Sequence, residues 1–105
     1  MIIILCTIPN HTSLVSKITK NLLNQKLAAC ITIINTVQSF YYWNNTLTTD
    51  TEIQLLIKTR NTLKTSVFKT IKEIHPYKIP ELLVLPILDG DSNYLSWMQS
   101  VLPQT

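Results

Sequence analysis

The sequence predicts an α+β fold of the ferredoxin-like class, with one β-α-β-β-α-β domain over residues 1–105 and a further helix at its C-terminal end. The first observation is that β-branched apolar runs alternate with segments of helical periodicity. The second is that the two middle strands are joined by an asparagine pair, a connection too short to contain a helix. Together these observations indicate two β-α-β halves joined by a hairpin.

The chain opens with a strand and a helix. Residues 2–7 are mostly apolar and β-branched, which is typical of a central strand. Leucine, valine and isoleucine then recur at helical spacing through residues 14–23 and predict one apolar stripe. We expect Asn10 or Thr12 to cap this helix, because both side chains accept hydrogen bonds from backbone N–H groups.

A long hairpin is predicted next. Residues 27–43 have β character, Asn44 and Asn45 tolerate the positive φ of a tight turn, and residues 47–59 form the return arm. Arms of this length extend past an ordinary small sheet, and a lone two-stranded ribbon is only marginally stable. We therefore expect another surface to cover the distal half of the hairpin.

The second half of the chain repeats the strand and helix pattern. Apolar residues at helical spacing predict a helix over residues 63–74, which Asn61 can cap and which a following His-Pro pair should stop. Residues 82–85 are apolar at every position and are bracketed by Pro80 and Pro86. This short run predicts a buried strand, and the two prolines favour the edge of the sheet.

The final helix follows the only glycine, and Asp91 or Ser92 can cap it. Both main helices should cover the same face of the sheet, which leaves the other face bare within the chain. The composition agrees with such a surface, because 46% of the residues are hydrophobic and only 14% are charged. Self-association is the simplest way to cover an apolar face of this kind.

Composition also limits the partners. No apolar run approaches the roughly twenty residues that cross a bilayer, and the N-terminus lacks the basic start of a signal peptide. We therefore expect a cytoplasmic protein with free cysteines and no membrane contact. The net charge of +3 is spread over scattered lysines, and Arg60 is the sole arginine, which argues against nucleic acid binding. The aromatic residues at positions 40–43 are better explained as interface anchors.

The sequence predicts no enzyme, since it carries no Ser-His-Asp order and no phosphate-binding glycine loop. CxxC and HxxH spacings are also missing, so a structural zinc site is not expected. Cys6 and His75 are the candidate metal ligands, because thiolate and imidazole suit copper and zinc. The alternative for Cys6 is a small core residue, since free cysteine is among the most buried residue types.

A ligand cleft or subunit interface is predicted around the turn that enters the last strand. Tyr77, Lys78 and Glu81 lie in this turn, and Trp43 and Trp97 are further candidates from the hairpin and the final helix. Glu81 is the most suggestive of them, because it stands between a proline and an apolar run. Its plainer interpretation is an ion pair with Lys78 or another lysine.

Several segments of the sequence resemble the CutA divalent-cation tolerance family. They are Leu5–Pro9, Gln25–Ile31, Tyr41–Trp43, His75–Tyr77, Pro80–Pro86, Gly90–Asp91 and Tyr94–Trp97. The resemblance implies a homotrimer similar to the PII signalling proteins, in which long hairpins wrap neighbouring subunits. It also implies a cytoplasmic protein without catalytic activity that is linked to tolerance of copper and other divalent cations.

For the metal, the resemblance supports copper at Cys6 and at two adjacent histidines just before the Pro-Tyr pair. Ile74 stands where one of these histidines is expected, so Cys6 and His75 would form a weak or shared site. The leading hypothesis is therefore a non-enzymatic homotrimer that binds or responds to metal ions. The alternatives are a PII-like regulator that holds a small anion or metabolite between subunits, and a structural adaptor.

Overall fold

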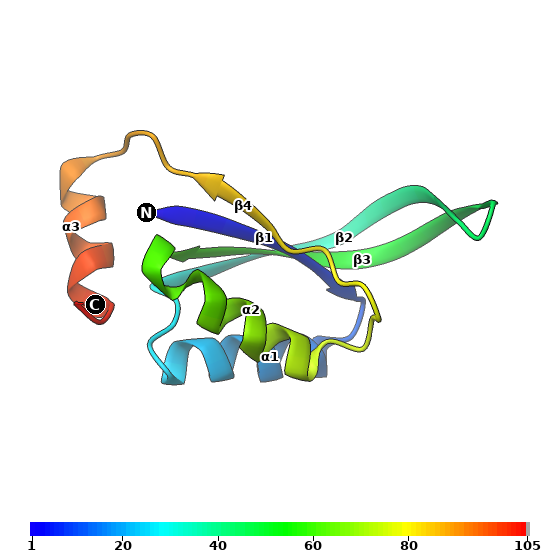
Figure 1. The fold of residues 1–105 in the computed structure, drawn as a ribbon, viewed down its shortest axis with the longest axis horizontal. Helices are drawn as coiled ribbons and strands as arrows, with labels where there is room; N and C mark the ends of the chain where they lie inside the picture. Colours follow the sequence, from blue (N-terminus) through cyan, green and yellow to red (C-terminus); the bar gives the residue numbers. More distant parts are fainter. Residues whose placement is uncertain (105) are drawn as a thin grey trace.

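The structure is a computed structural model that describes residues 1–104, and it confirms the predicted ferredoxin-like fold (Figure 1). Its strands are β1 (Ile2–Pro9), β2 (Cys30–Trp43), β3 (Thr46–Thr59) and β4 (Leu83–Pro86). Its helices are α1 (Thr12–Asn24), α2 (Lys64–Ile74) and α3 (Ser92–Val101), with a short 3₁₀ turn, η1 (Asn61–Leu63), before α2. Helices α1 and α2 lie together on one face of the sheet, and α3 stands at its end (Figure 1).

The four strands form one antiparallel sheet in the order β2-β3-β1-β4. β1 is central, as the sequence predicts, and β2 and the proline-bracketed β4 are the two edges. Pro86 of β4 pairs with Ile2 of β1. An edge strand tolerates a residue that has no N–H group to donate, so the proline is accommodated there.

The core lies between the sheet and helices α1 and α2. The inward residues of the two central strands face one another as the pairs Ile4 and Ile57, Cys6 and Leu55, and Ile8 and Ile53, and each is at most 1% exposed. The helices contribute fully buried residues at helical spacing, namely Ile18, Leu22, Val67 and Ile71. Strand alternation and helical periodicity thus meet in one core.

The opposite face of the sheet carries a second apolar surface. Because paired residues of an antiparallel sheet point to the same side, the register places Ile3, Leu5, Leu56, Leu83 and Leu85 together on it. We call these five residues the open face. Leu83 is 55% exposed and Leu85 is 45% exposed. The prediction of a buried last strand is therefore wrong for the single chain, because this side of β4 has no covering helix among residues 1–104 (Figure 1).

The hairpin formed by β2 and β3 extends well beyond the rest of the sheet (Figure 1). β1 pairs with β3 only as far as Pro9 opposite Glu52, so residues 46–51 of β3 pair with β2 alone. Asn44 and Asn45 have φ values of 51° and 62°, which confirms the predicted positive-φ turn. The distal half of the hairpin is consequently a lone two-stranded ribbon.

Helix capping is confirmed at α3 and differs at the other two helices. The Asp91 carboxylate accepts a hydrogen bond from the Tyr94 N–H at 3.0 Å. His11 takes the N-cap position of α1 and makes no side-chain capping bond, so neither predicted side chain caps this helix. Asn61 begins η1 and Leu63 precedes α2, because the 3₁₀ turn moves the helix start past the predicted cap.

Candidate functional site

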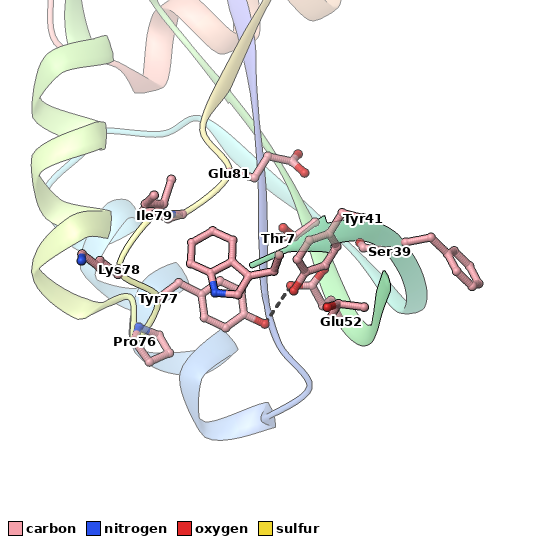
Figure 2. Close-up of a pocket in the computed structure, with 13 residues that line it drawn as sticks. Thr7, Ser39, Tyr41, Glu52, Pro76, Tyr77, Lys78, Ile79 and Glu81 are labelled. Atoms are coloured by element: carbon pink, nitrogen blue, oxygen red, sulfur yellow. Dashed lines mark hydrogen bonds between the residues drawn. The ribbon is translucent and has the colours of Figure 1, made fainter. Parts of the chain in front are cut away.

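A cavity of about 700 Å³ lies beside the root of the hairpin. Its walls come from β1, from the hairpin and from residues 76–81, the segment that leads from α2 towards β4 (Figure 2). Four of the predicted cleft or interface residues line it, namely Trp43, Tyr77, Lys78 and Glu81. Trp97 does not belong to this wall; it lies on α3, with its ring centroid 5.6 Å from that of Tyr94.

The cavity holds a buried carboxylate. Glu52 is 3% exposed, and its Oε2 atom accepts a hydrogen bond from the Tyr77 hydroxyl at 2.8 Å (Figure 2). Burial, this hydrogen bond and the charge of Glu52 raise the pKa of Tyr77, so the hydroxyl remains a hydrogen-bond donor at neutral pH. Glu52 is the residue that site prediction missed, because it lies on the outward side of β3, where the alternation predicts solvent exposure.

A second tyrosine and carboxylate pair lies across the hairpin. The Tyr41 hydroxyl donates a hydrogen bond to the Asp50 Oδ2 atom. This hydrogen bond is the main cause that raises the pKa of Tyr41. Tyr41 and Glu52 both line the cavity from the hairpin, and Glu81 lines it from the segment 76–81.

The remaining charged groups of the cavity wall point elsewhere. The Lys78 ammonium is directed away from Tyr77 and Glu52, and the Glu81 carboxylate points in a different direction from Lys78 (Figure 2). This arrangement therefore does not favour the ion pair between Lys78 and Glu81 that the sequence suggests.

His75 attaches the cavity-lining segment to the sheet. It is 7% exposed, its Nε2 atom lies 2.7 Å from the Thr7 carbonyl oxygen, and its Nδ1 atom accepts the Tyr77 N–H at 3.1 Å. Because Nδ1 accepts a hydrogen bond, the proton belongs on Nε2, which donates to Thr7. The neutral ring also packs on Tyr77, with centroids 4.8 Å apart. His75 thus holds Tyr77 in place for its bond to Glu52.

Cys6 is completely buried on the helix side of β1. Its thiol makes a long contact of 3.8 Å with the Thr7 carbonyl oxygen. Burial, followed by the charges of Glu81 and Glu52, raises the pKa of the Cys6 thiol to about 12. The thiol is therefore protonated at neutral pH, whereas metals bind the thiolate.

As folded, Cys6 and His75 do not fit a metal centre within one chain. Both imidazole nitrogens are engaged in hydrogen bonds and the thiol is protonated. Among residues 1–104, no group of three or more His, Cys, Asp or Glu side chains is placed to hold a metal ion. Ile74, at the end of α2, adds no ligand. Metal binding by Cys6 and His75 stays a prediction, and it requires these contacts to open.

The element order, the sheet topology and the long hairpin define a ferredoxin-like α+β protein with an added C-terminal helix. The family model of the CutA1 divalent ion tolerance proteins matches residues 2–101. The chain belongs to this family, which confirms the assignment suggested by its sequence segments.

Individual relatives agree with this membership. The chain is 43% identical to the divalent-cation tolerance protein CutA of Yersinia pestis (strain Pestoides F) over 101 residues. This alignment covers 96% of this chain and 84% of the relative. The divalent cation tolerance protein of Thermus thermophilus has a TM-score of 0.92 at 33% identity, over 98% of this chain and 100% of that one. The periplasmic divalent cation tolerance protein CutA from Archaeoglobus fulgidus has a TM-score of 0.90 at 31% identity, over 96% of this chain and 98% of that one.

Proposed function

We propose that this protein acts as a non-enzymatic homotrimer in the response of the cell to divalent cations such as copper. Membership of the divalent ion tolerance family supports the role in cation response. The observation that carries the self-association is the open face, whose apolar side chains on β1, β3 and β4 lack a covering layer within residues 1–104. A contiguous apolar surface of this kind is typical of a subunit interface.

The distal half of the hairpin supports the same proposal. Its most exposed apolar side chains are Phe40, Tyr42, Trp43 and Leu47, which are between 50% and 74% exposed. Aromatic residues are enriched at protein interfaces, and a lone two-stranded ribbon gains stability when another surface packs on it. We expect each hairpin to lie against a neighbouring copy, which is the trimeric arrangement that the family resemblance implies.

Sedimentation equilibrium is expected to give three times the mass of one chain at micromolar concentration. The double variant Phe40→Ser and Tyr42→Ser should form a weaker trimer, because it lacks the two aromatic side chains that contact the neighbouring copy. The Thr46→Ser variant, a polar change on the same hairpin, serves as the control and should remain trimeric. A wild-type protein that stays monomeric at every concentration would contradict the proposal.

Copper titration tests the metal-binding part of the proposal. If Cys6 and His75 hold the ion, the Cys6→Ala and His75→Ala variants should each bind copper more weakly than the wild type, since each loses one ligand. His11→Ala is the matched control, because it removes the other histidine of the chain, which is exposed at the start of α1. Equal copper affinity in the wild type and in both site variants would rule out this pair as the site.

The cavity supports a second candidate function, that of a PII-like regulator that holds a small ligand. Four side chains predicted from the sequence to line a ligand cleft surround this one cavity. Small-molecule sites are concave and mostly apolar, with a few placed polar groups, and this cavity has that character. The adaptor alternative has no comparable observation in its favour.

The compartment of the protein remains a prediction. No helix among residues 1–104 is long and apolar enough to cross a membrane. We propose a cytoplasmic location, which is what the family resemblance implies, whereas the relative from Archaeoglobus fulgidus is described as periplasmic. Fractionation of cells that express the full chain tests this location directly.

A further inference from the structure

The cavity beside the root of the hairpin has a chemistry that selects among ligands. We propose that it binds a small organic cation, a protonated amine whose ammonium group sits on Glu52 and whose apolar body lies against aromatic side chains. This inference rests on the second candidate function, the ligand-binding cavity, and it names the class of ligand.

The first support is the charge of Glu52. Its side chain is almost fully buried, and the hydrogen bond that it accepts comes from the neutral hydroxyl of Tyr77. A buried carboxylate is costly unless a cation compensates it. Lys78 is the cation among the residues that line the cavity, and its ammonium points away from Glu52 (Figure 2). A ligand with a positive charge would supply the missing partner.

The second support is the local electrostatic field. Burial is the main cause that raises the pKa of the Cys6 thiol and of Tyr77, and nearby carboxylates add to both shifts. Glu81 and Glu52 act on Cys6, and Glu52 and Asp50 act on Tyr77. The cavity lining contains two carboxylates, Glu52 and Glu81, and one lysine, Lys78, so its charge is net negative, although the chain as a whole carries a net charge of +3. An anionic ligand would be repelled here, whereas a cation would be attracted.

The third support is the aromatic wall. Tyr41, Trp43 and Tyr77 line the cavity. The faces of aromatic rings attract cations, and they also bury the apolar part of an organic ligand. A hard metal cation needs several oxygen ligands, and no such group of side chains is placed together among residues 1–104. An aromatic wall beside a single buried carboxylate fits an amine better than a bare metal ion.

Three probes of similar shape and different charge test the inference by isothermal titration calorimetry. They are phenethylammonium, its neutral counterpart 2-phenylethanol and the anion 3-phenylpropionate. We expect the amine to bind, the alcohol to bind at least about tenfold more weakly than the amine, and the anion not to bind. The reason is that a hydrogen bond between charged groups raises the affinity about tenfold or more.

Variants of the cavity sharpen the test. Glu52→Gln keeps the shape and an oxygen that can accept the Tyr77 hydrogen bond, and it should weaken amine binding about tenfold or more. Glu73→Gln is the matched control, since Glu73 is exposed on α2 outside the cavity, and it should bind as the wild type does. Lys78→Ala removes an exposed positive charge from the wall and should tighten amine binding.

Each contrary result overturns the cation inference. If the alcohol or the anion binds the wild type as tightly as the amine does, the ligand-binding cavity stands and the cation inference falls. The inference also falls if Glu52→Gln binds the amine with the affinity of the wild type, or if Lys78→Ala binds the amine more weakly than the wild type does. Lys78 is exposed, so the second variant tests the inference without disturbing a buried group. If no probe binds, the inference falls as well, and native mass spectrometry of the purified protein then decides separately whether any ligand occupies the cavity.

Discussion

Replacing His75 with alanine is expected to lower the free energy of unfolding by about 2–4 kcal/mol even when chelator keeps the protein free of metal. The change leaves the Thr7 carbonyl and the Tyr77 N–H without their partner and opens a space in a buried region. The first contact attaches His75 to β1 and the second holds Tyr77 on His75, so the segment 76–81 that lines the cavity should also loosen. Urea unfolding followed by circular dichroism in the presence of EDTA measures the effect.

The other histidine provides the control for this prediction. His11 is exposed and its side chain makes no capping bond, so His11→Ala should change the stability by less than about 0.5 kcal/mol. If the two variants were equally stable, the structural role assigned to His75 would be wrong. The result also governs how the copper titration is interpreted, because a weaker affinity in His75→Ala is evidence for a ligand only while that variant remains folded.

The parts of the fold that could be predicted from the sequence depend on local patterns. The alternation of Ile53, Leu55 and Ile57 marks the inward side of β3, and this side is buried in the core. The asparagine pair marks the turn, because few other residues tolerate positive φ at two successive positions. Such signals depend on short stretches of chain, so they can be recognised without knowledge of the tertiary structure.

The features that the sequence did not predict arise from contacts between distant segments. Glu52 has the alternation of an exposed residue, and it is buried because residues 76–81 fold beside it and bring the Tyr77 hydroxyl to its carboxylate. Leu83 and Leu85 look like core residues in sequence, yet they lie on the open face of a single chain. In both cases the burial of a side chain is decided by which segment covers its face of the sheet, and the local pattern does not carry that information.

The candidate metal ligands illustrate the same limit. Cys6 and His75 are distant in sequence, and the structure brings His75 to the carbonyl group of Thr7, the residue that follows Cys6. The burial of Cys6 agrees with the alternative that the sequence offered, a small core residue, whereas ligand type gave no indication that backbone groups would engage both imidazole nitrogens. The types of side chain suggest a chemistry, but their protonation and hydrogen bonds decide whether that chemistry is available.

Thiol-specific labelling at pH 8 is expected to separate the two cysteines by a large factor in rate. Cys30 is half-buried at the start of β2 and should react in the native protein. Cys6 is fully buried with a pKa raised to about 12, so it should react only through unfolding, which slows labelling by about a thousandfold or more in a stable domain. The Cys30→Ser variant should retain only the slow reaction, and Cys6→Ala only the fast one.

The raised pKa of Cys6 also predicts how stability depends on pH. Below the ordinary thiol pKa near 9, the thiol is protonated in both the folded and the unfolded chain, and its contribution to stability is fully present. As the pH rises from about 9 towards 12, the unfolded chain releases this proton while the folded chain retains it, so the free energy of unfolding falls. Tyr77 should act in the same direction above its ordinary pKa of 10, because its pKa is raised as well.

Cys6→Ala isolates the contribution of the thiol, since this variant should lose less stability than the wild type across that alkaline range. Rapid labelling of Cys6 in the native protein at pH 8, or an identical pH profile in Cys6→Ala, would contradict the burial argument. Such a result would also mean that the thiolate is accessible in the folded chain, which is the condition that copper binding at Cys6 requires. Thiol reactivity and metal affinity at this position are therefore linked, because both depend on whether the folded protein can release the Cys6 proton.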